Sequence, residues 1–175
     1  MLPKEFEGKS ACCCTGHRPF GLPDGGDATG AGMCALAHAL LHCVGEAAEL
    51  GVRTFYCGGA AGFDTFAAEA VLVWKERYYP DIRLCLALPE RVRAGELAPD
   101  MRLRYDSILA RADDVYYATV GSLKLAYLQR NRYMVEHADC CIAYLKTMSG
   151  GTLYTVNYAL ERGLSVYNLA QYDNR

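Results

Sequence analysis

The hydrophobic pattern alternates between short apolar runs and longer segments with helical spacing. The short runs have the length of β-strands: Ala11–Cys14, Thr54–Cys57, Ile82–Leu88, Cys140–Leu145 and Leu164–Asn168, with a shorter one at Val115–Tyr117. Most of these runs are apolar throughout rather than alternating with polar residues. This pattern predicts a parallel sheet that is covered on both faces.

Helical segments are predicted between the strands. The first carries apolar residues at three- and four-residue spacing from Met33 to Ala48 and ends before Gly51. The others are expected to begin at Phe63, at Pro99, after the N-cap Ser122, and at the segment Ser149–Thr152. The alternation predicts one Rossmann-like α/β domain over residues 1–175, with three layers and a mostly parallel sheet. Residues 91–122 depart most from this rhythm.

Composition and charge narrow the class of protein. A chain of 175 residues can bury a sizeable core, and its net charge of −2 without a Lys/Arg cluster makes nucleic acid an unlikely partner. The segment Met1–Ser10 has no long apolar run, so no membrane segment is expected. The nine cysteines form no Cys-x-x-Cys and are interpreted as small buried hydrophobes, which predicts no metal site and a reducing, cytoplasmic location.

Glycine-rich segments follow the second and fifth predicted strands. In a parallel α/β sheet the carboxyl ends of all strands lie along one edge, so these segments are expected to share that edge with Thr15–Pro19 (TGHRP) and Leu88–Glu90. Glycine allows backbone N–H groups to approach an anion, and a helix N-terminus adds positive potential. The expected phosphate-binding residues are Gly16, His17, Arg18, Gly58, Gly59, Gly62, Ser149, Gly150, Gly151 and Thr152.

Some polar residues near these segments allow two interpretations. Asp64 follows a glycine loop and either bonds ribose hydroxyls or caps its own helix. Glu69 is a candidate general acid or base, with a solvated helix residue as the alternative. Arg130 and Asn131 either face the crevice or belong to a charged outer face. Several tyrosines are candidates for stacking on a base: Tyr105, Tyr116 and Tyr117.

The complete set of motifs resembles the SLOG superfamily, and most of all its YpsA/DUF1273 branch. The resemblance rests on TGHRP, GGAAGFD, QRNRYMVEHAD and SGGT and spans about Cys12 to Asn168. It implies that a nucleotide or nucleotide-derived ligand binds at the glycine loops. The related Lonely Guy enzymes carry a catalytic glutamate in PGGxGTxxE, whereas here Gly151-Thr152 is followed by Leu153–Val156, without a carboxylate. This departure argues against phosphoribohydrolase activity.

Three functions remain open from the sequence. The first is binding or sensing of a phosphate-bearing nucleotide derivative, similar to ADP-ribose, with no required cofactor and a possible homodimer. The second is an enzyme, a nucleotide N-glycoside hydrolase in which Asp64 or Glu69 is catalytic. The third is single-stranded DNA binding, as in the SLOG member DprA; the net negative charge and the lack of a Lys/Arg cluster argue against it.

Overall fold

The structure, a computed structural model, describes residues 1–89, 99–119 and 121–171. Its centre is a six-stranded parallel sheet with the strand order β4-β3-β2-β1-β5-β6. The strands are β1 (Ala11–Gly16), β2 (Thr54–Cys57), β3 (Arg83–Pro89), β4 (Asp114–Ala118), β5 (Cys140–Tyr144) and β6 (Ser165–Asn168). The predicted parallel sheet is therefore confirmed.

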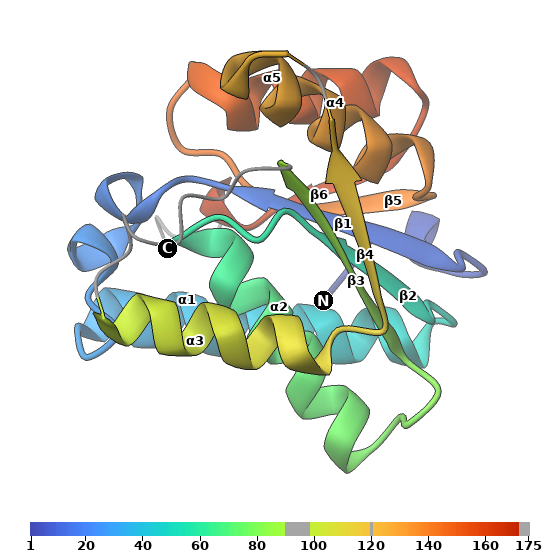
Figure 1. The fold of residues 1–175 in the computed structure, drawn as a ribbon. Coiled ribbons are helices and arrows are strands. Elements are labelled where there is room, and N and C mark those ends of the chain that lie inside the picture. Colours follow the sequence, from blue (N-terminus) through green and yellow to red (C-terminus); the bar gives the residue numbers. More distant parts are fainter. Residues whose placement is uncertain (90–98, 120, 172–175) are drawn as a thin grey trace.

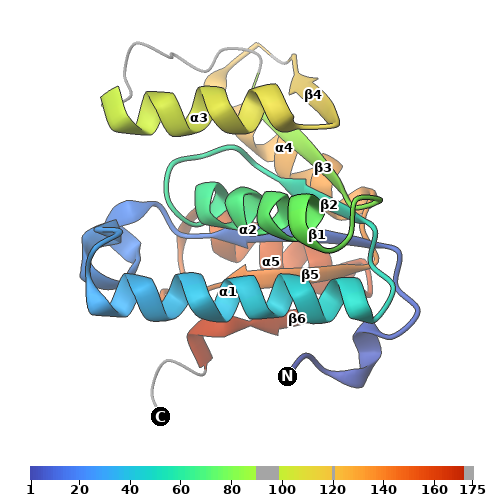
Figure 2. The same cartoon turned by 90° about the horizontal axis from the view of Figure 1, so that it is seen from below.

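Helices cover both faces of this sheet (Figure 1). One face carries α1 (Ala31–Glu49), α2 (Phe63–Arg77) and α3 (Pro99–Arg111), and the other carries α4 (Leu123–Glu136) and α5 (Gly150–Glu161). Figure 2 shows α1, α2 and α3 side by side as one layer in front of the sheet. The three-layer Rossmann-like fold is confirmed. Short 3-10 helices complete the described chain: η1 (Lys4–Phe6), η2 (Pro19–Gly21), η3 (Pro23–Gly26) and η5 (Leu169–Gln171).

The two faces of the sheet have separate cores because successive side chains of a strand point to opposite sides. Cys12 and Cys14 belong to the larger core with α1 and α2, whereas Cys13 packs with Met134 of α4 and Val156 of α5. Eight of the nine cysteines are buried, which agrees with their interpretation as small hydrophobes. Cys34 is the exception: it lies on the exposed side of α1, so its predicted burial is wrong.

In the described part of the chain, α1 is the one helix long and apolar enough to span a membrane by length and composition alone. The apolar residues of α1 are explained by packing within the protein. Met33, Leu40 and Val44 are fully buried and belong to the core that includes β1 and α2. Gly45 allows close contact with α2, since a Cβ at this position would overlap the ring of Trp74.

Most predicted boundaries differ from the structure by one or two residues. The important difference is β1, which continues through Thr15 and Gly16 because both residues pair with β5. The following loop therefore begins at His17. The helix and the short strand predicted between residues 91 and 122 are both present, as α3 and β4. Glu90 lies outside the described residues.

Candidate functional site

A pocket of about 420 Å³ lies where the order of the strands reverses. β1 and β5 are neighbours, but the chain continues from β1 toward one edge of the sheet and from β5 toward the other. In open α/β sheets, ligands bind outside the carboxyl ends of the strands at such a switch point. Here most of the lining comes from the end of β1 and the loop after it, from the loop after β5 with the start of α5, and from the middle of α4: Thr15–Arg18, Phe20, Tyr127, Arg130, Asn131, Thr147 and Ser149–Thr152.

His17 joins the two loops that form the pocket. Its Nε2 accepts hydrogen bonds from the backbone N–H groups of Lys146 and Thr147, at 3.0 and 3.2 Å. Accepting from two N–H groups requires a ring nitrogen without a proton, so the imidazole is neutral and carries its proton on Nδ1. Burial lowers the pKa of His17 and favours the same neutral form. His17 therefore holds the β5–α5 loop in place, and its Nε2 is already engaged.

Asp64 and Arg130 form a buried ion pair at the wall of the pocket. Arg130 Nη1 lies 3.1 Å from Asp64 Oδ2, and the two side chains are only 8% and 6% exposed. The same carboxylate oxygen accepts a hydrogen bond from the backbone N–H of Ala60 at 3.3 Å. The carboxylate thus fixes both the glycine loop and the arginine. Of the two interpretations of Arg130, the structure favours the one in which it faces the crevice.

The glycines after β2 make room for neighbouring groups. A Cβ on Gly58 would overlap the guanidinium of Arg130, and one on Gly59 would overlap the side chain of Leu88. Gly62 has φ of 103°, and a Cβ there would lie 2.6 Å from the carbonyl oxygen of His17. None of these three glycines is in the lining of the pocket. The loop contributes Ala60 and Asp64 instead.

The N-terminus of α5 presents its first turn to the pocket. Ser149 is the N-cap residue, and its side chain makes no capping hydrogen bond. The N–H groups of Gly150, Gly151 and Thr152 belong to the first turn of the helix, where no intrahelical acceptor is available. They line the same pocket as Arg18 and Arg130. This arrangement concentrates positive potential and free donors at one place.

Several buried polar side chains in the lining have no protein partner. Thr15, Asn131 and Thr152 are 6 to 8% exposed, and over residues 1–89, 99–119 and 121–171 no hydrogen bond of their side chains is found. Arg18 likewise lacks a carboxylate partner among these residues; its guanidinium lies over the ring of Tyr127. Among the described residues, the fully buried polar atom of the lining without a hydrogen-bond partner is Nε of Arg130. Buried polar atoms are usually satisfied. The clustering of these unpartnered groups around one cavity is typical of a binding site for a polar ligand.

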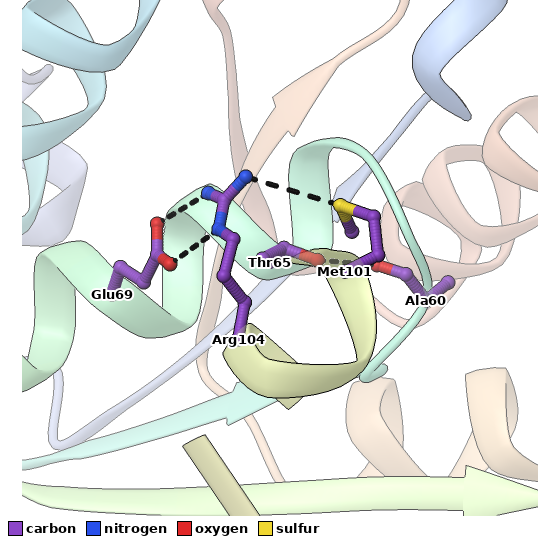
Figure 3. A network of polar contacts seen from close by, with 5 residues as sticks. All are labelled: Ala60, Thr65, Glu69, Met101 and Arg104. Atoms are coloured by element: carbon purple, nitrogen blue, oxygen red, sulfur yellow. Dashed lines mark hydrogen bonds and ion pairs between the residues drawn. The ribbon is translucent and has the colours of Figure 1, made fainter. Parts of the chain in front are cut away.

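Glu69 lies on α2 but is not in the lining of the pocket. Its two carboxylate oxygens accept from Nε and Nη2 of Arg104 on α3, at 2.8 and 2.6 Å (Figure 3). Arg104 also lies over the ring of Phe66. The structure therefore brings Asp64, but not Glu69, into the pocket, and Glu69 serves to join α2 to α3.

The pocket lining contains two aromatic residues that were not predicted as site residues from the sequence, Phe20 and Tyr127. Tyr127 precedes Arg130 by one helical turn, so their shared face could have been found from the spacing on α4. The proposed stacking tyrosines lie elsewhere. Tyr116 stacks on Tyr133 at a centroid distance of 3.7 Å, Tyr105 packs against the larger core, and neither of these nor Tyr117 is in the lining.

The fold and the site define a Rossmann-like α/β domain with a polar pocket at the switch point of its sheet. The chain belongs to the YspA SLOG family, whose model YpsA matches residues 12–171. The resemblance to the SLOG superfamily and its YpsA branch is confirmed.

Relatives of the chain include proteins named by family number only. A UPF0398 protein of Bacillus cereus (strain B4264) is 26% identical, over 85% of this chain and 82% of the relative. The uncharacterized SPbeta prophage-derived protein YoqJ of Bacillus subtilis (strain 168) is 27% identical, over 60% of this chain and 68% of the relative.

DNA processing protein A from Helicobacter pylori, described for its single-stranded DNA binding mode, has a similar fold. The TM-score is 0.61 with 17% identity, covering 94% of this chain and 67% of that one. At this identity the similarity shows the fold alone.

Proposed function

We propose that the chain binds a phosphate-bearing nucleotide or nucleotide derivative, such as one similar to ADP-ribose, in the pocket between the β1 and β5 loops. The observation that carries the proposal is the set of unpartnered donors around one cavity: the first turn of α5, Asn131, Thr152 and Arg18. A phosphate group has acceptor oxygens and negative charge, and both are complementary to this set.

The geometry favours binding over hydrolysis of an N-glycoside. Asp64 is the one carboxylate in the lining formed by the described residues, and one of its oxygens already accepts from Arg130 and Ala60. General acid–base catalysis needs a group within hydrogen-bond reach of the reacting atoms. Glu69, the other candidate, is bonded through both oxygens to Arg104. A role in binding or sensing requires neither residue to transfer a proton.

The test is calorimetric titration and thermal unfolding with AMP, ADP, ADP-ribose and NAD, followed by chromatography of each ligand. A ligand at 100 times its Kd adds about 2.7 kcal/mol to stability. The expected result is a shift with the ligand recovered intact. Release of a base or of ribose phosphate would instead establish an enzyme.

A matched pair of arginine variants locates the site. Arg18→Ala removes a cation from the lining and should weaken binding, by roughly tenfold for one charge-assisted contact. Arg132→Ala is the control, because Arg132 is exposed on α4, bonds to Tyr154 and is not in the lining. Equal effects of the two variants would contradict the proposed location.

Single-stranded DNA binding is the second candidate, and the fold shared with DNA processing protein A is what favours it. It predicts an affinity that falls steeply as salt rises, because contacts to several phosphates release counterions. Titration of an oligothymidylate at two salt concentrations decides between a strand and a single phosphate-bearing ligand.

A further inference from the structure

We propose that Phe20 is a stacking platform for the base of the bound ligand, so that the site recognises a nucleobase joined to a phosphate. This inference rests on the proposed function, because it assigns a second part of the ligand to the same pocket. Phe20 is 88% exposed. Of the large apolar side chains that are exposed in the described chain, it alone lies in the lining of the pocket.

The exposure of Phe20 is imposed by a firmly held turn. Phe20 is the middle residue of η2, which closes through hydrogen bonds from Gly21 N to Arg18 O and from Leu22 N to Pro19 O, at 2.9 and 3.0 Å. Leu22, two residues later, is buried in the larger core and anchors the turn. The aromatic ring is therefore held outside the core by the backbone that carries it. Such preorganisation lowers the entropy cost of binding a ligand.

The glycines around the turn restrict its position further. A Cβ on Gly21 would lie 2.7 Å from Cβ of His17, and a Cβ on Gly26 would lie 2.8 Å from Cβ of Pro19. The turn is thus packed closely against η3 and against His17. Because His17 also bonds to the β5–α5 loop, the turn that carries Phe20 is joined through one residue to the loop leading into α5.

The ring of Phe20 also has no aromatic or cationic neighbour among the described residues. Of the other rings in the lining, that of His17 lies edge-on to Tyr144, and that of Tyr127 has the guanidinium carbons of Arg18 and Arg130 each 5.4 Å from its centroid. Among the described residues, no ring or cation contacts Phe20. Bases stack on aromatic side chains through their faces, largely independently of sequence. Phe20 offers such a surface, and the first turn of α5 offers donors for the attached phosphate.

Two sources can supply this chemistry: a free nucleotide, or a nucleotide within a single strand. Both contain a planar base and a phosphate. They differ in the number of phosphates that contact the protein, and so in salt dependence. The inference concerns the chemistry that they share, and the experiment includes both.

The experiment compares the four nucleoside monophosphates with ribose 5-phosphate, using the wild-type chain and Phe20→Ala in calorimetric titrations. Alanine substitution of a stacking residue lowers affinity by roughly 5- to 150-fold per base. We expect that loss for at least one nucleoside monophosphate and none for ribose 5-phosphate, which has no base. Phe20→Trp should retain the affinity. Tyr78→Ala is the control, because Tyr78 is an exposed aromatic residue outside the pocket. This variant should change the affinity for neither ligand.

The outcomes separate this inference from the proposed function. If the wild type binds nucleotides and ribose 5-phosphate equally, or if Phe20→Ala binds nucleotides as the wild type does, Phe20 is not a platform and the phosphate site stands. If the wild type binds none of these ligands and no oligothymidylate, both proposals fail. A Phe20-dependent, salt-sensitive affinity for the oligothymidylate that exceeds that for the monophosphates assigns the base to a single strand. A Phe20-dependent affinity that is higher for the monophosphates than for the oligothymidylate assigns the base to a free nucleotide.

Discussion

Asp64→Asn should destabilise the chain strongly, because it leaves the Arg130 guanidinium buried without a counter-charge. The two charges lie 3.1 Å apart with side chains 8% and 6% exposed, so water screens them little. At an effective dielectric constant of about 20, their attraction is about 5 kcal/mol. Measured losses on breaking buried pairs are about 3–5 kcal/mol. Since asparagine still accepts from Ala60 N–H, we expect a loss near the lower value, about 3 kcal/mol.

Urea denaturation followed by the fluorescence of Trp74, the single tryptophan, measures this loss. Arg130→Met should also destabilise the chain. The double variant should be more stable than the sum of the two losses predicts, by at least about 1 kcal/mol, since neither charge is then left alone. Arg102→Ala is the control: its pair with Asp106 is 44% and 50% exposed and should contribute less than about 1 kcal/mol. Strict additivity of Asp64→Asn and Arg130→Met would refute the argument.

Other predictions concern the glycines, the first helix and His17. Gly58→Ala should destabilise the chain by about 1–3 kcal/mol, because the added Cβ displaces Arg130. Gly151→Ala is the control: its Cβ meets only Asn131 Nδ2, at 4.0 Å, so the free energy of unfolding measured in urea should be nearly unchanged. Asp24→Ala should lower the stability of the fold by about 1 kcal/mol, because the carboxylate no longer accepts the 3.0 Å hydrogen bond from Met33 N–H at the start of α1. Asp24→Gly should lower it less, because φ of Asp24 is 52° and glycine adopts a positive φ without strain. Equal losses for the two variants would show that the positive φ is irrelevant. The pKa of His17 should lie below its ordinary value of 6.5, so the contact stabilises the fold above that pH and is lost as pH falls through the lowered pKa. Imidazole NMR titration measures this pKa, and a value above 6.5 would contradict the neutral tautomer.

The sheet was predictable because most of its strands are short apolar runs, and such runs are strong local signals. Cys140–Tyr144 is buried at every position, as an interior parallel strand requires. The end of β1 was not predictable in the same way. Thr15 and Gly16 are typical of a loop by residue type, but they pair with Ala143 and Tyr144. That pairing depends on the neighbouring strand, about 130 residues away in the sequence, and no local pattern records it.

The two glycine-rich segments show why the site was only partly predictable. In sequence, the segments after β2 and β5 have the same character, and both suggest a phosphate-binding loop. In the structure, Gly58 accommodates Arg130, whereas Gly151 lines the pocket. A Cβ would overlap the Arg130 guanidinium at Gly58, whereas at Gly151 it would meet only Asn131 Nδ2, at 4.0 Å. Because the residue type is the same, the sequence cannot say whether the space beside a glycine is filled by the protein or left for a ligand. The unpartnered side chains supply that distinction: Asn131 and Thr152 lie beside the α5 loop without a protein acceptor or donor among the described residues, while Asp64 beside the β2 loop has two protein donors. We therefore place the phosphate of the proposed ligand at the α5 loop, and Asp64 after the β2 loop holds the arginine that lines the same pocket.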